Sequence, residues 1–442
     1  MKKIIVLVAG ICLIAYTLFV NDKPNVILIV SDATRADHLG VYGYNKNTSP
    51  NIDKFARDGV LFLDTRSQST HTKLAVPAII ASVYPTQHGI TNYGHALSDS
   101  FTTMAEILKA EGYQTVGFVT NVHLQEVYGF AQGFDDYWCN RYFEHDHPGN
   151  VTNAEDVVDD FVNWLDTEQQ EPFFAFLFFI DQHAPYTPPV AFVEGDTSWR
   201  NAAGGWGDSH IGAFEGADRQ GVIDLYDGEI RYFDSEFGRL MSELKKRELY
   251  DNSIIIYTSD HGEAFWEHGL VGHGTALYDE MLKVPLVVKW PKSGDAIDYF
   301  KPGHAAEPTA HVDILPMLCE RLGIDAPRTV DTGIVSELYL DQKVRIDQDE
   351  PYLIASIVKN DLKLIITHHQ SDSTTDIELF DIHNNPKELV NLAGKLTART
   401  QHLKNALSVA SGRMVRERYA PAQRGAPTQH ELAELKALGY VE

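Results

Sequence analysis

Residues 24–40 read PNVILIVSDATRADHLG, and two features of this stretch decide the fold. Its first half, Val26 to Val30, is an uninterrupted apolar run rich in β-branched side chains. Such a run is typical of a strand buried on both faces of an α/β sheet. Its second half begins with Ser31 and Asp32, so polar chemistry starts where the strand ends. Because open α/β sheets bind ligands at the carboxyl ends of their strands, this junction is a candidate site.

Working outward, strand-like and helix-like patterns alternate up to about residue 340. The strand-like runs are short and apolar, and they lie at 60–63, 173–180, 253–258 and 285–290. Helical patterns separate them at 100–111, 153–168 and 224–247. This alternation predicts one large α/β domain.

The pattern changes after residue 340. Three short strands separated by turns are predicted at 352–358, 363–367 and 377–381, followed by a helix at 393–416 and a last short helix at 429–438. We expect a small antiparallel sheet with a packed helix. The predicted organisation is therefore a catalytic domain over 23–340 and a C-terminal α/β subdomain over 341–442.

The composition is that of a globular and acidic protein. The chain carries 37 Lys and Arg residues against 62 Asp and Glu residues, which gives a net charge of −25. Nucleic-acid binding needs clustered basic residues, so this balance argues against a nucleic-acid partner.

The N-terminus predicts export. Lys2 and Lys3 precede an apolar run from Ile4 to Val20, which is the short end of a membrane span. We expect residues 1–22 to be a signal sequence or a membrane anchor, and the rest of the chain to be extracytoplasmic. No small-residue cleavage motif is evident, so cleavage and retention at the membrane both stay open.

The three cysteines, Cys12, Cys139 and Cys319, are too few for a disulfide framework. Because Cys12 lies in the leading apolar segment, at most one bridge remains, between the other two. None of them has the CxxC spacing of a thiolate zinc site.

Polar residues follow three of the predicted strands. Asp32 follows the first, Asp181 and His183 follow the strand at 173–180, and Asp260 with His261 follow the strand at 253–258. One aspartate at a strand end is more often a cap than a ligand. Three such ends carrying carboxylate and imidazole groups predict a site for a divalent ion such as Mg²⁺, Ca²⁺, Mn²⁺ or Zn²⁺.

A set of motifs, in order and spacing, resembles the sulfatase family of the alkaline-phosphatase superfamily. The motifs lie at 32–44, 48–53, 59–62, 84–89, 259–263, 267–269, 273–274, 277–280, 284–286, 311–316, 378–393 and 436–441. The resemblance covers nearly the whole chain from residue 24 onward. It implies a large alkaline-phosphatase-like domain with a mixed, mostly parallel sheet between helices, plus a small C-terminal antiparallel-sheet subdomain.

The resemblance also implies a metal centre. Asp32 matches the family's first metal-binding aspartate, and Asp260 with His261 matches its late metal pair. Histidine at the second position of that pair is the phosphatase-like variant. Ala33 stands where the family often has another aspartate, so one ligand is missing or comes from elsewhere.

Further roles follow position by position from the same resemblance. His183 matches a residue that contacts the anionic ester group or the leaving oxygen. His273 matches a position, often Lys, that protonates the leaving group. Asn121 and His123 fall where the family often has two substrate-binding residues, Lys and His.

The nucleophile position is a departure from the family pattern. Alignment backward from Tyr84-Pro85 places Thr72 where sulfatases have the Cys or Ser that becomes formylglycine. Alignment on Pro77 would place Ala75 there and leave no nucleophile. Thr72 is preferred, because it puts a hydroxyl at the start of a predicted helix, where an anion is attracted and where Lys73 adds charge. Thr72 also fits a helix N-cap, and it can serve both roles.

The predicted function is therefore metal-dependent hydrolysis of a sulfate or phosphate ester through a covalent intermediate on Thr72. The substrate would be an anionic ester of a small molecule, glycan or lipid. One alternative is a transferase that passes a phospho-group to a membrane-associated acceptor. Another is a binding protein that lost catalysis, which Ala33 and the missing Cys and Arg of the family motif suggest.

Overall fold

The computed structural model describes residues 23–91, 94–139, 153–194, 219–292, 302–326, 334–340, 352–369 and 373–423. The predicted signal or anchor at 1–22 and the predicted last helix at 429–438 lie outside these residues. Among the described residues, no helix combines the length and the apolar character needed to span a bilayer.

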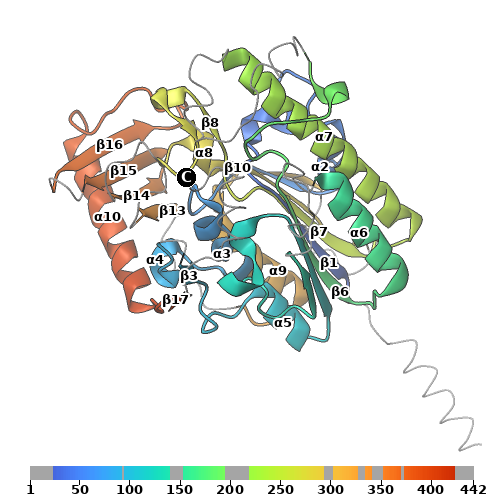
Figure 1. Cartoon of the computed structure of the whole chain (residues 1–442). Coiled ribbons are helices and arrows are strands. Elements are labelled where there is room, and N and C mark those ends of the chain that lie inside the picture. Colours follow the sequence, from blue (N-terminus) through green and yellow to red (C-terminus); the bar gives the residue numbers. More distant parts are fainter. Residues whose placement is uncertain are drawn as a thin grey trace, which may run out of the picture.

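A nine-stranded sheet forms the centre of the large domain (Figure 1). Its order is β11 (Gly303–Ala305), β2 (Val60–Arg66), β10 (Lys283–Lys289), β7 (Ser253–Thr258), β1 (Asn25–Ser31), β6 (Phe173–Phe179), β4 (Gln114–Val119) and β5 (Asp136–Trp138), and β12 (Thr309–Ala310) also pairs with β2. Strand β10 runs antiparallel to both β7 and β2, and the other pairings are parallel. The expected mixed, mostly parallel sheet is therefore confirmed.

Strand β1 explains why the opening stretch decides the fold. Successive side chains of a strand point to opposite faces, and those of β1 enter two different cores. Val26, Leu28 and Val30 pack into one core, while Ile27 and Ile29 pack into the other. All five are fully buried. A run without polar alternation is what a strand between two helical layers requires.

Helices cover both faces of the sheet (Figure 1). One layer contains α2 (Pro50–Ala56), α6 (Ala154–Thr167) and α7 (Arg219–Lys246), whose side chains share a core with Ile27. The other contains α3 (Thr72–Ala81), α5 (Met104–Ala110) and α9 (Ile314–Leu322), whose side chains share a core with Val26. The ends of the strands therefore lie between two layers of helices.

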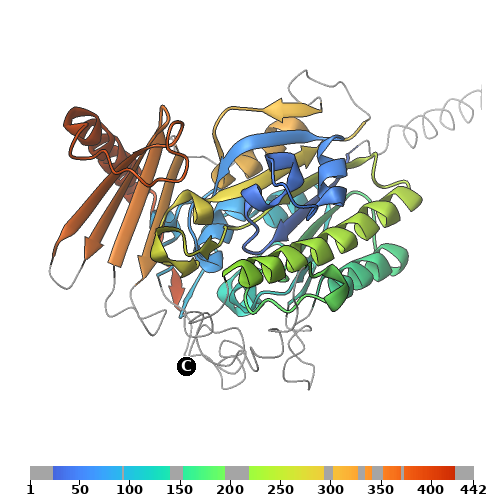
Figure 2. The same cartoon turned by 90° about the horizontal axis from the view of Figure 1, so that it is seen from above.

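A second, four-stranded antiparallel sheet lies beside the large one (Figure 2). Its order is β13 (Ile334–Leu340), β14 (Tyr352–Lys359), β15 (Leu362–His369) and β16 (Thr375–Asp381), and α10 (Thr397–Arg416) packs on it. Strand β13 pairs with β14 along its whole length. The second sheet thus begins at Ile334, before the boundary that the sequence predicts at 340/341.

Among the strands of six or more residues, β4 and β13 have no counterpart among the elements expected from the sequence, and each has a physical reason. Strand β4 is short and contains Gly117, which weakens a strand pattern. Strand β13 has its apolar run broken by Ser336 and Glu337, yet both are buried. Ser336 donates to the carbonyl of Ser67, and Glu337 accepts from the backbone and hydroxyl of Thr86. These polar side chains therefore serve the contact between the two sheets.

A buried ion-pair cluster also joins the two parts of the chain. Lys363 of β15 lies 2.7 Å from a carboxylate oxygen of Asp279 and 2.8 Å from one of Glu388. Arg66 of β2 donates two hydrogen bonds to Asp279, the first residue of α8 (Asp279–Leu282). We call these four residues the inter-sheet cluster. It holds the segment after β7 against the second sheet.

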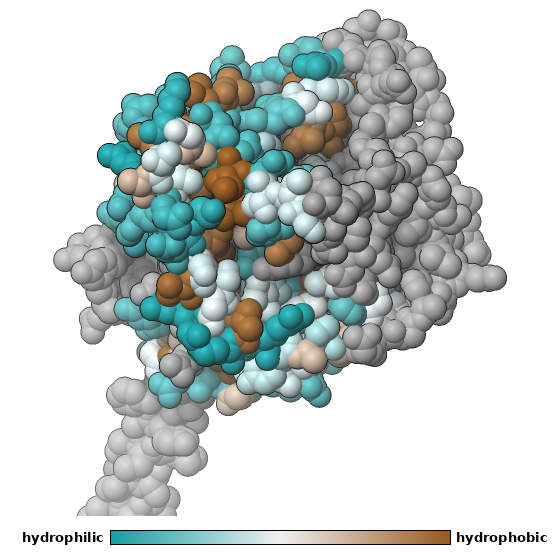
Figure 3. Space-filling view, turned by 90° about the vertical axis from the view of Figure 1, so that its left-hand side faces the viewer, coloured by the Kyte–Doolittle hydropathy of each residue, from teal (hydrophilic) through white to brown (hydrophobic). Residues whose placement is uncertain are grey.

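The surface shows no concentrated apolar region on the face drawn in Figure 3, where hydrophobic residues form small groups among hydrophilic ones. Exposed hydrophobic side chains in the C-terminal part include Leu389, Val390, Val409 and Val415. Scattered apolar side chains of this kind are normal on protein surfaces.

Candidate metal centre and active site

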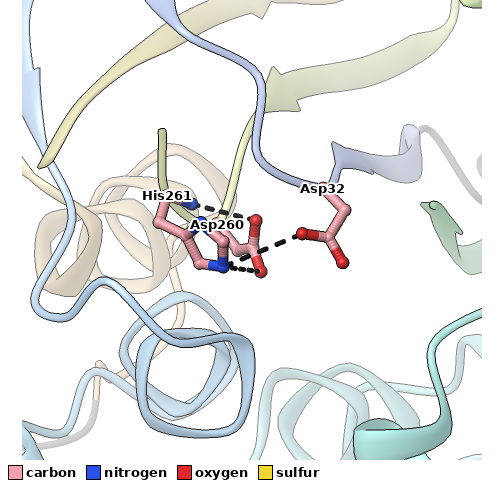
Figure 4. A group of neighbouring side chains, drawn as sticks. All are labelled: Asp32, Asp260 and His261. Atoms are coloured by element: carbon pink, nitrogen blue, oxygen red, sulfur yellow. Dashed lines mark hydrogen bonds and ion pairs between the residues drawn. The ribbon is translucent and has the colours of Figure 1, made fainter. Parts of the chain in front are cut away.

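Three side chains with metal-ligand chemistry meet at the carboxyl ends of β1 and β7 (Figure 4). Asp32 directly follows β1, and Asp260 and His261 follow β7. Each offers one ligand atom, and these atoms all lie within 4.8 Å of one another. All three residues are fully buried. The structure therefore brings together the three residues expected to bind a metal.

Backbone pairing explains this convergence. Strands β7, β1 and β6 are parallel neighbours, so their carboxyl ends meet at the same edge of the sheet. The amide of Asp32 donates to the carbonyl of Phe179 at the end of β6. The amide of Ala33, a residue with a left-handed φ of 55°, donates to a carboxylate oxygen of Asp260. Ala33 thus contributes its backbone to the site where the family often has a carboxylate.

Two carboxylate oxygens indicate that a cation belongs here. Asp32 Oδ1 and Asp260 Oδ2 are buried and accept no hydrogen bond from the residues that the structure describes. Burial and the neighbouring charge of Asp260 raise the pKa of the Asp32 carboxyl well above its ordinary value. Buried polar atoms normally have partners, and a divalent cation would satisfy both oxygens.

His261 is oriented for the same purpose. Its Nδ1 lies 2.9 Å from the carbonyl oxygen of Gly262, which can only accept, so Nδ1 carries the proton. The other nitrogen, Nε2, then presents a lone pair 3.4 Å from Asp260 Oδ2 and 3.8 Å from Asp32 Oδ1. Three electron-rich atoms facing one another fit a hard or borderline divalent metal ion.

Thr72 lies beside this group. Its hydroxyl oxygen is 3.3 Å from His261 Nε2, and its side chain is buried. Thr72 is the first residue of α3, and His71 precedes it as the N-cap, with its ring accepting from the amide of Lys73. The hydroxyl therefore stands at a helix N-terminus and next to the candidate ligands, whereas Ala75 lies a turn further along α3.

The three residues expected to bind substrate differ in what they contact. The ammonium of Lys73 lies 3.4 Å from the centroid of the Tyr128 ring. Asn121 donates its amide to Asp32 Oδ2 at 2.7 Å, so it holds a candidate ligand in place. His123 is buried, and its ring centroid is 5.2 Å from that of His71. Asn121 thus has a contact that sequence comparison does not reveal.

His183 and His273 lie together beside His261. The ring centroid of His273 is 4.3 Å from that of His261 and 4.9 Å from that of His183. Nδ1 of His183 donates to the carbonyl of Ala184 at 2.6 Å. Both histidines expected to act on the leaving group therefore border the candidate metal centre.

Sequence reasoning assigned no role to three side chains at the site. His71 caps the helix of Thr72, Glu263 contacts His273, and Tyr186 donates to Glu263. Glu263 falls inside the motif at 259–263 and Tyr186 lies three residues after His183, but only the folded chain shows what they touch.

Burial also sets the charge of the surrounding histidines. It lowers the pKa of His71 to about 3, and the charges of His261 and Lys73 act in the same direction. Burial, with His71 and Lys73 nearby, lowers the pKa of His123 well below its ordinary value. Both rings are therefore neutral at neutral pH and act as dipoles.

The two remaining cysteines are elsewhere in the fold. Cys139 and Cys319 are both buried, and the single disulfide left open by the sequence does not form between them.

Comparisons with known proteins agree with this architecture. The family model described as Sulfatase matches residues 24–324. An uncharacterized sulfatase of Escherichia coli, YidJ, is 24% identical over 428 residues, covering 84% of this chain and 83% of that protein. An arylsulfatase of Clostridium perfringens is 24% identical over 448 residues, covering 84% of this chain and 90% of that protein.

A solved structure shares the fold. The phosphonate monoester hydrolase of Agrobacterium radiobacter superposes with a TM-score of 0.70 at 20% identity, covering 91% of this chain and all of that one. The family match spans more than half of the chain and includes every strand of the large sheet. The chain therefore belongs to the sulfatase family, the sulfuric ester hydrolases of the alkaline-phosphatase superfamily.

Proposed function

We propose that this sulfatase-family chain is a divalent-metal-dependent hydrolase of phosphate or sulfate esters that works through a covalent intermediate on Thr72. One observation carries the proposal. The Thr72 hydroxyl lies 3.3 Å from His261, within a buried group whose two carboxylates have unsatisfied oxygens. A nucleophile and a cation site in contact are what transfer to a hydroxyl requires.

Asp32, Asp260 and His261 would hold the metal, with the Thr72 hydroxyl as a further ligand. When bound, a divalent cation lowers the pKa of a coordinated hydroxyl and neutralises negative charge on ester oxygens. Oxygen and imidazole donors suit Mg²⁺, Ca²⁺, Mn²⁺ or Zn²⁺, and the choice among them stays open.

The other steps of the reaction are assigned to side chains of the protein. Thr72 Oγ1, after losing its proton to solvent, attacks phosphorus or sulfur, and the bond to the leaving alcohol oxygen breaks. His273, with His183 beside it, delivers a proton to that oxygen. The N-terminus of α3, Lys73 and Asn121 stabilise negative charge on the transferring oxygens. Water then hydrolyses the Thr72 ester and releases phosphate or sulfate.

The threonine favours phosphate over sulfate. Formylglycine is made from Cys or Ser, and the β-methyl group of Thr72 blocks that conversion. A Thr72 ester must therefore be hydrolysed at phosphorus or sulfur, and such attack is faster for phospho-threonine than for sulfo-threonine. Family membership favours sulfate, so the proposal keeps both ester classes.

A phospho-group transferase is the second candidate. A hydroxyl nucleophile keeps the transferred group as a stable ester, which an acceptor alcohol can attack in place of water. The predicted N-terminal signal or anchor would place the enzyme on the extracytoplasmic side, where the acceptor would be a glycan or a lipid. Release of inorganic phosphate in the presence of excess glycerol, compared with formation of glycerol phosphate, separates the two reactions.

Peptide mass spectrometry tests the proposal. The metal-loaded enzyme is exposed briefly to 4-nitrophenyl phosphate or 4-nitrophenyl sulfate, quenched in acid and digested. We expect an adduct on the peptide that contains Thr72, and we expect the Thr72→Ala enzyme to lose both adduct and turnover. Undiminished turnover by Thr72→Ala would remove Thr72 as the nucleophile. Absence of turnover by the wild-type enzyme on every ester, with metal bound, would favour a binding protein.

A further inference from the structure

His273 needs a structural partner if it is to act as a proton donor. An imidazole has two nitrogens, and the group that one of them contacts decides which tautomer the ring adopts. His273 lies between the rings of His261 and His183. The side chain of Glu263 contacts one of its ring nitrogens.

Glu263 is a fully buried carboxylate with two directed contacts. Its Oε1 lies 3.1 Å from His273 Nδ1. Its Oε2 accepts from the hydroxyl of Tyr186 at 2.9 Å. A buried carboxylate is costly to maintain unless its oxygens are paired, so an arrangement that uses both oxygens on neighbours of the active site indicates a role there.

The backbone around Glu263 is held as firmly as its side chain. The amides of Gly262 and Glu263 donate to the carbonyls of Met281 and Glu280, and Arg35 donates to the Glu263 carbonyl at 3.0 Å. The carboxylate is therefore anchored both through its chain and through Tyr186. The contact with this fixed carboxylate therefore also restrains the orientation of the His273 ring.

We propose that Glu263 is the positioning residue of His273, with Tyr186 fixing the carboxylate. By accepting from Nδ1–H, Glu263 fixes the rotamer of the ring in which Nε2, which carries the proton to be transferred, is directed to the leaving oxygen. A lysine at this position carries its proton without such help, whereas a histidine needs an orienting group. The inference rests on the proposed function, because His273 is the leaving-group acid only if the ester chemistry occurs.

The kinetic test uses leaving groups of different quality. Acid catalysis by a side chain contributes about 10²–10⁴-fold and is needed most by poor leaving groups. We expect Glu263→Gln and Glu263→Ala to lower kcat for phenyl phosphate by about 10²-fold, with KM unchanged, and to affect 4-nitrophenyl phosphate by less than about 10-fold. Tyr186→Phe should give a smaller loss of the same kind.

A double-mutant cycle separates positioning from general damage. If Glu263 acts through His273, the Glu263→Ala/His273→Ala enzyme should be no slower than His273→Ala alone. Additive losses, or equal losses on both esters, would overturn the proposal. Glu337→Gln is the matched control, since Glu337 is equally buried but bonds Thr86 in the contact with the second sheet. It should leave the leaving-group dependence unchanged.

A spectroscopic readout keeps the inference testable without turnover. In the Mg²⁺-loaded protein with ¹⁵N-labelled histidine, the neutral His273 ring, which is left after Nε2 has given up its proton, should keep its proton on Nδ1, and Glu263→Gln should give a mixture of tautomers of this neutral ring. An unchanged tautomer in Glu263→Gln would refute the positioning role even if the enzyme is inactive. A Thr72 adduct together with a negative result here would remove only this inference, whereas absence of any adduct would remove the proposed function.

Discussion

Two buried clusters of carboxylates differ in how their charge is compensated. In the inter-sheet cluster, Asp279 lies against Arg66 and Lys363, and the chain supplies the cations. In the candidate metal centre, Asp32 and Asp260 each keep a buried oxygen without a hydrogen-bond partner among the described residues. The chain itself compensates the charge of the first cluster, whereas the second has the ligand atoms that could hold an ion from solution.

The pKa values of one carboxylate from each cluster, Asp279 and Asp32, shift in opposite directions. Burial alone would raise the pKa of Asp279, but the charges of Arg66 and Lys363 outweigh it and hold the pKa well below its ordinary value. Burial raises the pKa of Asp32, and Asp260 raises it further. Burial therefore does not identify a functional carboxylate by itself. The presence or absence of a cation supplied by the chain distinguishes structure from function.

The largest effect should come from removing a ligand of the metal centre. Asp260→Asn keeps the shape but loses a charge that the metal requires, so we expect turnover to fall by at least about 10³-fold. Metal content measured by atomic emission should fall in parallel. An Asp260→Asn enzyme that binds metal as tightly as the wild type would show that the cation lies elsewhere.

The next effect concerns the cluster whose charge the chain itself compensates. Lys363→Met leaves Asp279 and Glu388 with less compensation in a buried setting, which costs about 3–5 kcal/mol of unfolding free energy. Urea unfolding measures this loss, while metal stoichiometry should not change. The control is Lys292→Met, because Lys292 and Asp251 form an exposed pair worth at most about 1 kcal/mol. Equal losses for both variants would contradict the comparison.

Metal removal should have a smaller effect on stability. A cation present at a hundred times its Kd stabilises the folded state by about 2.7 kcal/mol, so EDTA should lower the Tm of the wild type. In Asp32→Asn the shift should disappear. The metal-free variant should be at least as stable as the metal-free wild type, since it no longer buries an uncompensated carboxylate. A lower Tm for this metal-free variant would refute that account.

The smallest effect is a pH dependence of stability that comes from the pair of His268 and Glu280, next to the inter-sheet cluster. Nδ1 of His268 lies 2.8 Å from Glu280 Oε1, and Nε2 lies 3.2 Å from the carbonyl oxygen of Glu388. Burial alone would lower the His268 pKa, but the bond to Glu280 outweighs it and raises the pKa. The pair therefore contributes stability that is full below about pH 6.5 and is lost as pH rises through the folded pKa.

Thermal unfolding between about pH 6 and pH 9 measures this dependence. The Tm difference between wild type and His268→Gln should shrink as pH rises. A difference that is constant or grows with pH would contradict the protonated pair. The metal content of both proteins should be equal, which separates this contact from the metal centre.

Much of the large domain was predictable because its strands are locally recognisable. The apolar runs of β1, β6 and β7 predict buried strands without reference to their neighbours. Strand β13 was not predictable, because its buried Ser336 and Glu337 form hydrogen bonds with residues of the large domain. A strand whose polar side chains are buried by another sheet carries no local signal.

The sequence by itself determined which chemistry stands at the strand ends. Asp32, Asp260 and His261 directly follow strands that local pattern identifies, and parallel pairing makes their convergence predictable. Thr72 at the start of α3 likewise follows from motif spacing and the helix pattern.

Only the tertiary structure decided how these groups are oriented. Asn121 reaches Asp32 across 89 residues of sequence, and Tyr186 reaches Glu263 across 77. A hydrogen bond is sensitive to distances of a few tenths of an ångström, whereas sequence pattern locates an element only to within a few residues. Residue type therefore determined what the site can bind. The packing of two helical layers on the sheet determined which of these side chains form hydrogen bonds with one another.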